Sequence, residues 1–320
     1  MNTSKPIIII PGDKKSIFFE IFFKSLKKKF KSPLIIFTTK KIFKKELLYF
    51  NAKIKYKIIQ IKDLNIVKLN NKYLYLVDIL NENQKIKESK IFDNEFIKLS
   101  FDIALDLIEK NFTYKLLNGP INKKKFLKKK FLGITEFIAS KFKEKNYAML
   151  IYNKELSVCP LTTHLPIKLV AKNINQQEII NKAKIINNFY IDKFNYKPKI
   201  AVTGLNPHCE SNLRINEDEI IVSTAVNKCF KLGINIKGPM PADTLFIKEN
   251  RKKFDVILGM YHDQVLGPLK ALYEYDAINI TMGLPFLRVS PDHGPNEKMI
   301  HKNLSNPQSL IKALKFLDKN

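Results

Sequence analysis

The chain has 320 residues, 45% of them hydrophobic, and a formal net charge of +26 at pH 7. This composition indicates a folded protein with a sizeable core rather than a disordered chain. No apolar run approaches the roughly 20 residues that cross a bilayer, and the run 7–10 is too short for the apolar region of a signal peptide. We therefore expect a cytoplasmic protein without a membrane segment.

The basic charge raises the alternative of a nucleic-acid-binding protein. The lysines, however, are spread along the whole chain, and arginine, the side chain favoured for reading bases, occurs only at Arg214, Arg251 and Arg288. We expect no specific nucleic-acid partner. A non-catalytic basic protein that binds anions or nucleic acid stays open as an alternative.

The three cysteines are widely spaced and include no Cys-x-x-Cys pair. This argues against both a disulfide framework and a thiolate zinc site. Cys209 adjoins His208 and could be reactive, but we favour its interpretation as a small buried residue.

Short apolar strands and amphipathic helices alternate from the amino terminus onward. The expected strands are 6–10, 34–37, 54–61, 73–77, 115–117, 148–152, 156–160, 199–203, 254–258 and 277–280. The expected helices are 16–30, one that Thr38 caps, 94–109, 178–189 and 218–231. Such alternation predicts an α/β fold with a largely parallel sheet.

Three of the five histidines lie in polar turns next to threonine, proline or aspartate: His164, His208 and His262. Imidazole is the commonest neutral ligand of zinc and similar metals, and three histidines leave a coordination position open for substrate. They are far apart in the sequence, so spacing alone does not demonstrate that they converge. A structural role for each histidine remains an alternative.

Groups that could bind anions follow the third histidine. Lys270 lies two turns beyond His262 if that segment is helical, and Asn279 is near the end of an expected strand. Arg288 lies in a segment flanked by glycine and proline, which we interpret as a loop that binds a carboxylate or phosphate.

Asp243 and Asp263 are candidates for a general base or for partners that orient metal ligands. Their alternative roles are a helix cap and a surface carboxylate. The chain contains no Gly-x-Gly-x-x-Gly fingerprint, no P-loop and no Gly-x-Ser-x-Gly elbow, so no cofactor-binding residues are assigned from motifs.

Several stretches form an ordered set of motifs. They are Gly119-Pro120-Ile121-Asn122-Lys123, Thr135-Glu136-Phe137, 162–166, 204–208, 241–245, 260–264, and 279–288 running on to Asp292-His293-Gly294. In this order they resemble the 4-hydroxythreonine-4-phosphate dehydrogenase family of vitamin B6 biosynthesis. The resemblance covers nearly the whole chain and is densest from 119 to 294.

The resemblance implies a three-layer α/β/α fold akin to isocitrate and isopropylmalate dehydrogenases, with two domains and an interdomain cleft. It also implies a homodimer whose active site is shared between domains and subunits. Approximate domain boundaries are 1–130 with 285–320 for the first domain, and 131–284 for the second, which carries most metal and substrate residues.

The resemblance also assigns residues and chemistry. His164, His208 and His262 would bind a divalent metal (zinc, cobalt, magnesium or manganese), with one histidine supplied across the dimer interface. The substrate contacts would be Thr135, Lys270, Asn279 and Arg288. The reaction would be oxidation of 4-phosphohydroxythreonine by NAD or NADP, with decarboxylation to 3-amino-2-oxopropyl phosphate.

This chain departs from the family pattern at three places. Ile134 replaces a histidine that contacts substrate, 12–20 lacks most of the family's glycines and prolines, and 209–212 replaces a glycine-rich loop. Because isoleucine neither donates a hydrogen bond nor titrates, the same chemistry on another phosphorylated hydroxy acid or a diol stays open.

Overall fold

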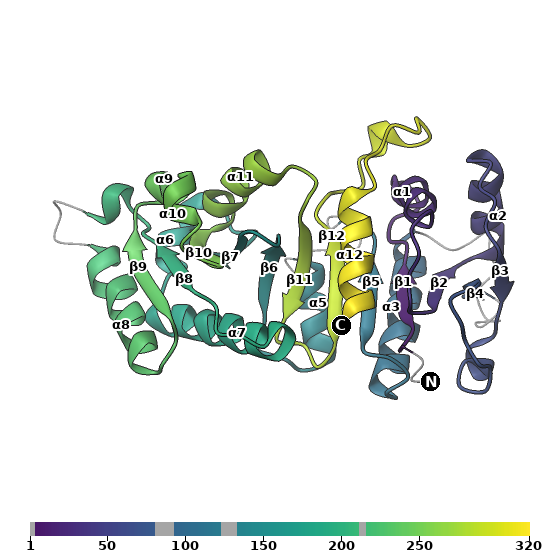
Figure 1. Ribbon diagram of the computed structural model, residues 1–320, viewed down its shortest axis with the longest axis horizontal. Coiled ribbons are helices and arrows are strands. Elements are labelled where there is room, and N and C mark those ends of the chain that lie inside the picture. The colour runs from purple at the N-terminus through teal and green to yellow at the C-terminus, as the bar shows by residue number, and fades with distance from the viewer. Residues whose placement is uncertain (1–3, 81–92, 123–132, 211–215) are drawn as a thin grey trace. The chain divides into compact units, whose positions relative to one another are not determined.

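The computed structural model describes residues 4–80, 93–122, 133–210 and 216–320. The chain divides into two compact units, unit 1 (Met1–Phe131 and Pro285–Asn320) and unit 2 (Leu132–Leu284). Each unit combines strands with covering helices (Figure 1). The predicted α/β class with a largely parallel strand arrangement is confirmed. Within the described residues, no helix is both long and apolar enough to span a membrane.

In unit 1, the strands lie side by side in the order β3-β4-β2-β1-β5-β12, and all the neighbours pair in parallel. The strands are β1 (Ile7–Ile10), β2 (Leu34–Thr38), β3 (Tyr56–Ile58), β4 (Leu74–Asp78), β5 (Lys115–Asn118) and β12 (Leu287–Pro291). The helices are α1 (Phe18–Ser25), α2 (Lys40–Tyr49), α3 (Asp93–Glu109) and α12 (Gln308–Lys319), with short 3-10 turns at Ile61–Asp63 and Glu297–Met299.

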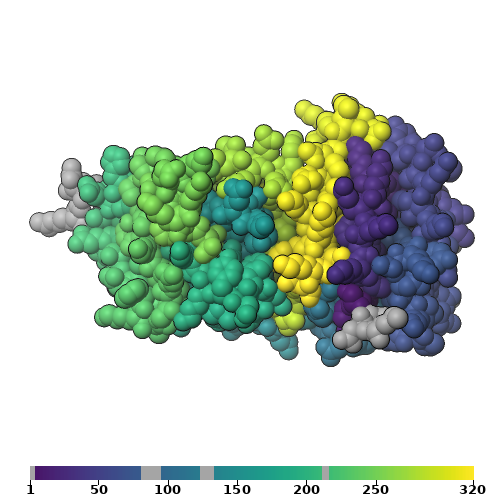
Figure 2. All heavy atoms as spheres, viewed as in Figure 1, coloured from purple at the N-terminus to yellow at the C-terminus, as the bar shows by residue number. Residues whose placement is uncertain are grey.

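Strand β1, in the middle of the strand order of unit 1, is apolar at every position. The four isoleucines of β1 are fully buried, which is typical of a parallel strand covered on both faces. Helix α12 packs on β12 and β5, and α1 packs against α12. Figure 2 shows α12, in yellow, as a continuous part of the surface of unit 1.

In unit 2, the strands lie in the order β11-β6-β7-β10-β8-β9. Strand β6 is antiparallel to both of its neighbours, whereas the strands from β7 to β9 pair in parallel. They are β6 (Ala148–Tyr152), β7 (Ser157–Thr162), β8 (Ile200–Thr203), β9 (Ile236–Met240), β10 (Val256–Tyr261) and β11 (Ile278–Met282). The helices are α5 (Ile134–Lys141), α6 (Val170–Asn173), α7 (Gln176–Phe194), α8 (Thr224–Lys231), α9 (Ala242–Leu245), α10 (Lys248–Arg251) and α11 (His262–Tyr273).

Alternate residues of β7 face different helix layers. Val158 belongs to a core cluster with Val265 and Leu269 of α11. Its neighbour Ser157 accepts a 2.9 Å hydrogen bond from the hydroxyl of Tyr190 on α7. Because successive side chains of a strand point to opposite faces, α7 and α11 enclose the sheet of unit 2 from its two sides (Figure 1).

Most of the predicted elements are present, with shifted ends. Helix α1 ends at Ser25 rather than at 30, and the predicted helix 218–231 consists of a π-helical segment, Asp218–Ser223, followed by α8. The prediction that Arg288 lies in a loop is wrong, because this residue is the second of β12. Elements absent from the predictions are α5, α6, β9, α9, α10, β12 and α12, and α11 was expected only as a condition on the spacing of Lys270.

The prediction that Thr38 caps α2 is also wrong. The N-cap is Thr39, whose Oγ1 accepts a 3.1 Å hydrogen bond from the backbone N–H of Ile42. Thr38 is the last residue of β2 and fully buried, and its hydroxyl has no hydrogen-bond partner among the described residues.

These two adjacent threonines give opposite expectations for stability. Thr39→Ala removes the cap and should lower the free energy of unfolding by about 1 kcal/mol. Thr38→Val keeps the side-chain shape and removes an unpaired buried hydroxyl, so the free energy of unfolding should stay the same or rise. Urea unfolding of both variants beside the wild type measures the difference. A larger loss in Thr38→Val than in Thr39→Ala would show that the cap is misassigned.

Candidate active site

Three neighbouring parallel strands of unit 2 end at one edge, and each is followed by one of the predicted metal ligands. Strands β7 and β10 pair in register, with Thr162 opposite Tyr261. His262 follows Tyr261 directly, and His164 comes two residues after Thr162. The two imidazole rings therefore approach each other, with their centroids 5.9 Å apart.

The side-chain amide of Gln264 holds these strand ends together. Its Oε1 accepts hydrogen bonds from the Thr203 hydroxyl and from the Met260 N–H, both at 2.7 Å. Its Nε2 donates to the carbonyl of Gly204 at 2.7 Å. The Thr162 hydroxyl donates to the Met260 carbonyl at 2.8 Å. The ends of β7, β10 and β8 are thus linked by hydrogen bonds at the edge that carries the histidines.

His208 lies in a turn after β8 that is anchored by a buried carboxylate. Asp218 is fully buried and accepts hydrogen bonds from the backbone N–H groups of Leu205 (2.6 Å) and Asn206 (2.9 Å). Gly204 is required here because a Cβ would lie 2.6 Å from Cys209 Sγ. The turn holds His208, which is exposed, in the left-handed conformation with φ 59°.

Cys209 has little nucleophilic character in this turn. Burial and the neighbouring Asp218 carboxylate raise the pKa of its thiol, and a hydrogen bond with the Gly204 backbone opposes them only in part. The thiol is therefore protonated near neutral pH, which agrees with a packing role rather than a reactive one.

The structure brings two of the three predicted ligands together. Across the described part of a single chain, no group of three or more histidine, cysteine, aspartate or glutamate side chains could hold a metal ion. His164 and His262 thus form a pair, and His208 is not grouped with them.

The His262 imidazole has a carboxylate partner. Its Nδ1 lies 2.6 Å from Oδ1 of Asp263, an exposed residue. A neutral imidazole that donates from Nδ1 to this carboxylate presents the lone pair of Nε2 outward. Metal-binding histidines are commonly oriented in this way, so the pair fits a metal ligand.

A pocket of about 450 Å³ lies beside His164. Its lining includes Thr135 and Glu136 from α5 and residues of β6, β7 and α7. The Thr135 hydroxyl is 3.4 Å from that of Thr281 on β11. On the same strand, Oδ1 of Asn279 is buried without a hydrogen-bond partner among the described residues, so it is available to a ligand donor.

The remaining predicted residues of unit 2 are exposed. Lys270 lies on α11, as its predicted helical spacing from His262 requires. Asp243 lies on α9 and is not the N-cap, which is Pro241; its Oδ1 accepts from the Thr244 N–H at 2.7 Å. The helix-cap alternative for Asp243 is therefore wrong.

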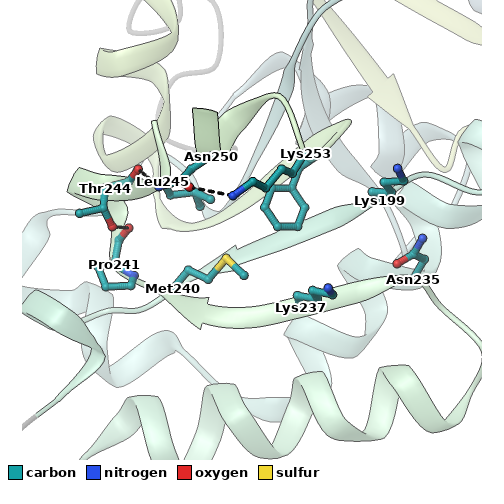
Figure 3. A pocket seen from close by; sticks show the side chains of 10 residues that line it. Lys199, Asn235, Lys237, Met240, Pro241, Thr244, Leu245, Asn250 and Lys253 are labelled. Carbon is teal, nitrogen blue, oxygen red and sulfur yellow. Dashed lines mark hydrogen bonds between the residues drawn. The ribbon is translucent and has the colours of Figure 1, made fainter. Parts of the chain in front are cut away.

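A second pocket, of about 530 Å³, lies on unit 2 and is lined in part by residues of β9. Figure 3 shows Pro241 and Thr244 at one end of it and Lys199 at the other. Lys237 and Lys253 also line it, and Lys253 donates to Asn250 at 3.2 Å. Lysines are spread over the whole chain, so the lysines of this pocket do not by themselves identify it as a binding site.

The chain is similar to proteins of known family over most of its length. The family model described as pyridoxal phosphate biosynthetic protein PdxA matches residues 29–317. The chain belongs to this family. The 4-hydroxythreonine-4-phosphate dehydrogenase of Sulfurihydrogenibium sp. is 36% identical over 97% of this chain and 96% of its own length. The enzyme of the same name from Aquifex aeolicus is 34% identical over 89% of this chain and 93% of its own length.

A solved structure extends the agreement to three dimensions. The crystal structure of the 4-hydroxythreonine-4-phosphate dehydrogenase from Klebsiella pneumoniae matches with a TM-score of 0.79 and 27% identity, covering 98% of both chains. The resemblance to this family is confirmed, and so is the prediction of an NAD-dependent dehydrogenase.

One of the expected departures from the family pattern, Ile134, lies in the first turn of α5. Ile134 is the first residue of that helix and is 6% exposed, so the isoleucine packs inward. The replaced glycine-rich loop begins with Cys209, which has φ 61°, a conformation that glycine adopts more readily. Ser211 and Asn212 of this loop, and Lys123 of an earlier motif, lie outside the described residues.

Arg288 belongs to unit 1. It is 3% exposed, and its Nε donates a 2.7 Å hydrogen bond to Oδ1 of Asn118, at the end of the neighbouring strand β5. Its role in binding an anion stays a prediction.

Sequence reasoning missed Gln264, Asp218 and Glu136. Gln264 and Glu136 stand inside motifs that resemble the family, but neither received a role. The available signal for Gln264 was its position in the first turn of a helix directly after a strand, where a side chain reaches back to strand ends. Asp218 carried no such signal, because its backbone partners lie 12 and 13 residues earlier.

Removal of the Gln264 amide should destabilise unit 2. Gln264→Ala loses three hydrogen bonds and leaves buried polar groups unpaired, so we expect a loss of about 3 kcal/mol in the free energy of unfolding, measured with urea. The matched control is Gln177→Ala, because Gln177 is exposed on α7 and its side-chain amide donates a hydrogen bond to the Asn181 side chain on the same helix. Equal stabilities of the two variants would contradict a linking role for Gln264.

Proposed function

We propose that this chain oxidises 4-hydroxythreonine 4-phosphate with NAD and releases carbon dioxide, giving 3-amino-2-oxopropyl phosphate. The observation that carries the proposal is the convergence of His164 and His262 at adjacent strand ends, in a chain that aligns with named dehydrogenases along nearly its whole length. NADP is the alternative nicotinamide cofactor.

His164 and His262 would hold a divalent metal, and His208 would come from a second copy of the chain. Two facts support a shared site: the first two rings are neighbours, and His208 forms no ligand group with them in one chain. Imidazole ligands favour zinc or cobalt over magnesium, with manganese between them. A bound ion of this kind supplies Lewis acidity, which lowers the pKa of a coordinated hydroxyl group.

The other side chains would bind and orient the substrate. The Asn279 Oδ1 would accept a hydrogen bond from it, and Thr135 would contact it from the first turn of α5. Lys270 and Arg288 would pair with its carboxylate and phosphate groups. Holding the reacting carbon in one orientation to the nicotinamide is the main contribution that such contacts make to the rate.

We assign the two aspartates different roles. Asp263 is a positioning residue, since its carboxylate is 2.6 Å from His262 Nδ1 and orients that ring. Asp243 is exposed and, among the described residues, its carboxylate accepts a hydrogen bond from the adjacent Thr244 N–H alone, so it is available as a proton acceptor.

The second candidate is the same chemistry on another phosphorylated hydroxy acid or on a diol. The observation in its favour is Ile134, a buried apolar residue where the family has a substrate-contacting histidine. A non-catalytic anion-binding protein would need a dedicated basic site, and the histidine pair argues against it.

Metal-reconstituted protein should produce NADH from 4-hydroxythreonine 4-phosphate. His262→Ala should lower kcat/KM by more than the 10- to 100-fold typical of losing a residue that only orients a metal ligand, because a ligand itself is lost. Metal content of the purified variant provides a second readout. His301→Ala is the control, since that histidine bonds to Glu46 in unit 1. Wild-type protein that binds metal and NAD without turnover would direct attention to the second candidate.

Mixing two inactive variants tests whether the site is shared. His208→Ala and His262→Ala should each be inactive alone. After subunit exchange, half of the dimers are mixed and each mixed dimer has one complete site, so about a quarter of the wild-type activity should return. No recovery, despite demonstrated subunit exchange, would contradict a site shared between two copies.

A further inference from the structure

Glu136 has a carboxylate oxygen that the fold buries and leaves without a partner. Its Oε2 has no hydrogen bond among the described residues. No lysine, arginine or histidine of the described chain forms a salt bridge with it. A buried carboxylate oxygen without a donor is costly, so a ligand that brings a donor or a positive charge is the expected compensation.

This oxygen lies close to the proposed metal ligand His164. Both groups border the same point, because a Cβ added to Gly133 would lie 2.6 Å from Glu136 Oε2 and 3.2 Å from His164 Cε1. Glu136 and His164 also line the same pocket of about 450 Å³. A small molecule held beside His164 is therefore within reach of the Glu136 carboxylate.

The other charges of this pocket do not neutralise Glu136. Lys182 donates to the Tyr147 carbonyl at 2.5 Å and lies over the Tyr147 ring, 5.3 Å from its centroid. Glu178, also in the lining, is exposed at the first turn of α7. Burial raises the pKa of the Tyr147 hydroxyl, and the negative charges of Glu136 and Glu178 raise it further. This phenol is therefore neutral at physiological pH and adds no charge.

We propose that Glu136 determines specificity by accepting a hydrogen bond from the amino group of the substrate. The inference rests on the proposed function, whose substrate is an amino acid phosphate. Ile134, at the start of the same helical turn, has no polar atom, so polar contacts from this turn come from Thr135 and Glu136. A carboxylate complements an amino group in both charge and hydrogen-bonding capacity.

A structural role for Glu136 is separable from this one. Glu136 is the third residue of α5 after its N-cap, Gly133, where glutamate and glutamine both support a helix start. Glu136→Gln therefore keeps size and capping capacity while it removes the negative charge. Because the change removes an unpaired buried charge, this variant should unfold at the same temperature as the wild type or at a higher one.

The decisive experiment measures binding by calorimetry on zinc-loaded protein without NAD. The ligands are 4-hydroxythreonine 4-phosphate and its analogue with hydrogen in place of the amino group. Glu136→Gln should bind the amino compound on the order of 10- to 100-fold more weakly and the analogue as the wild type does. Glu219→Gln, an equal change at an exposed glutamate outside the lining of this pocket, should behave as the wild type with both ligands.

Each contrary outcome has a distinct meaning. If Glu136→Gln remains folded and loses affinity equally for both ligands, or for neither, the role of Glu136 would be overturned while the proposed function would stand. Wild-type protein that binds the analogue at least as tightly as the amino compound would also overturn it. Wild-type protein that binds neither compound would contradict the proposed function, and this inference with it.

Discussion

The side-chain amide of Gln264 is the interaction on which the geometry of the strand edge depends. It satisfies a hydroxyl and an N–H as acceptor and a carbonyl as donor, all within 2.7 Å. A carboxylate of the same shape has no N–H to give to Gly204, and a lysine has no acceptor, so an amide suits this position best. Because these groups come from the end of β8 and from β10, their relative register is held where the histidines emerge.

The backbone around this amide is correspondingly constrained. Gly204 accepts one of its hydrogen bonds and also lies against Cys209 and Asp218, where a Cβ would approach to 2.6 and 3.0 Å. The buried Asp218 then fixes the next two backbone N–H groups. The conformation of the turn that carries His208 is thus constrained both at Gly204 and by Asp218. These contacts, rather than glycine residues, maintain the left-handed conformation of His208 and Cys209.

The sequence predicts best those elements whose burial is uniform. Strands such as β1 and β10 are apolar runs, and their positions agree with the expectation to within a few residues. Strand β9 was missed because it contains Gly238 and Pro239, residues that usually interrupt a strand. It lies at the end of the strand order of unit 2, where proline is tolerated since one side needs no ladder.

The candidate site was predictable in its residue types and only partly in its geometry. His164 and His262 were chosen because they lie in polar turns. Their proximity depends on the register of β7 and β10, in which Thr162 pairs with Tyr261, and the sequence does not reveal this register. Arg288 was placed in a loop because glycine and proline flank its segment. It lies in β12, which pairs in parallel with β5, and its guanidinium bonds to Asn118 of that strand, 170 positions earlier in the sequence.

Ile134 and Glu136 lie two residues apart in the first turn of α5, and one oxygen of the Glu136 carboxylate is buried without a hydrogen-bond partner among the described residues. In such surroundings an unpaired charge is more costly, and its interaction with a charged or hydrogen-bonding ligand is stronger. A diol or hydroxy acid without an amino group would leave the carboxylate unpaired, and a site built around a polar contact rejects ligands that lack it more strongly than an apolar site does. The proposed role of Glu136 therefore favours selectivity for an amino compound, whereas Ile134 by itself suggests a broader specificity.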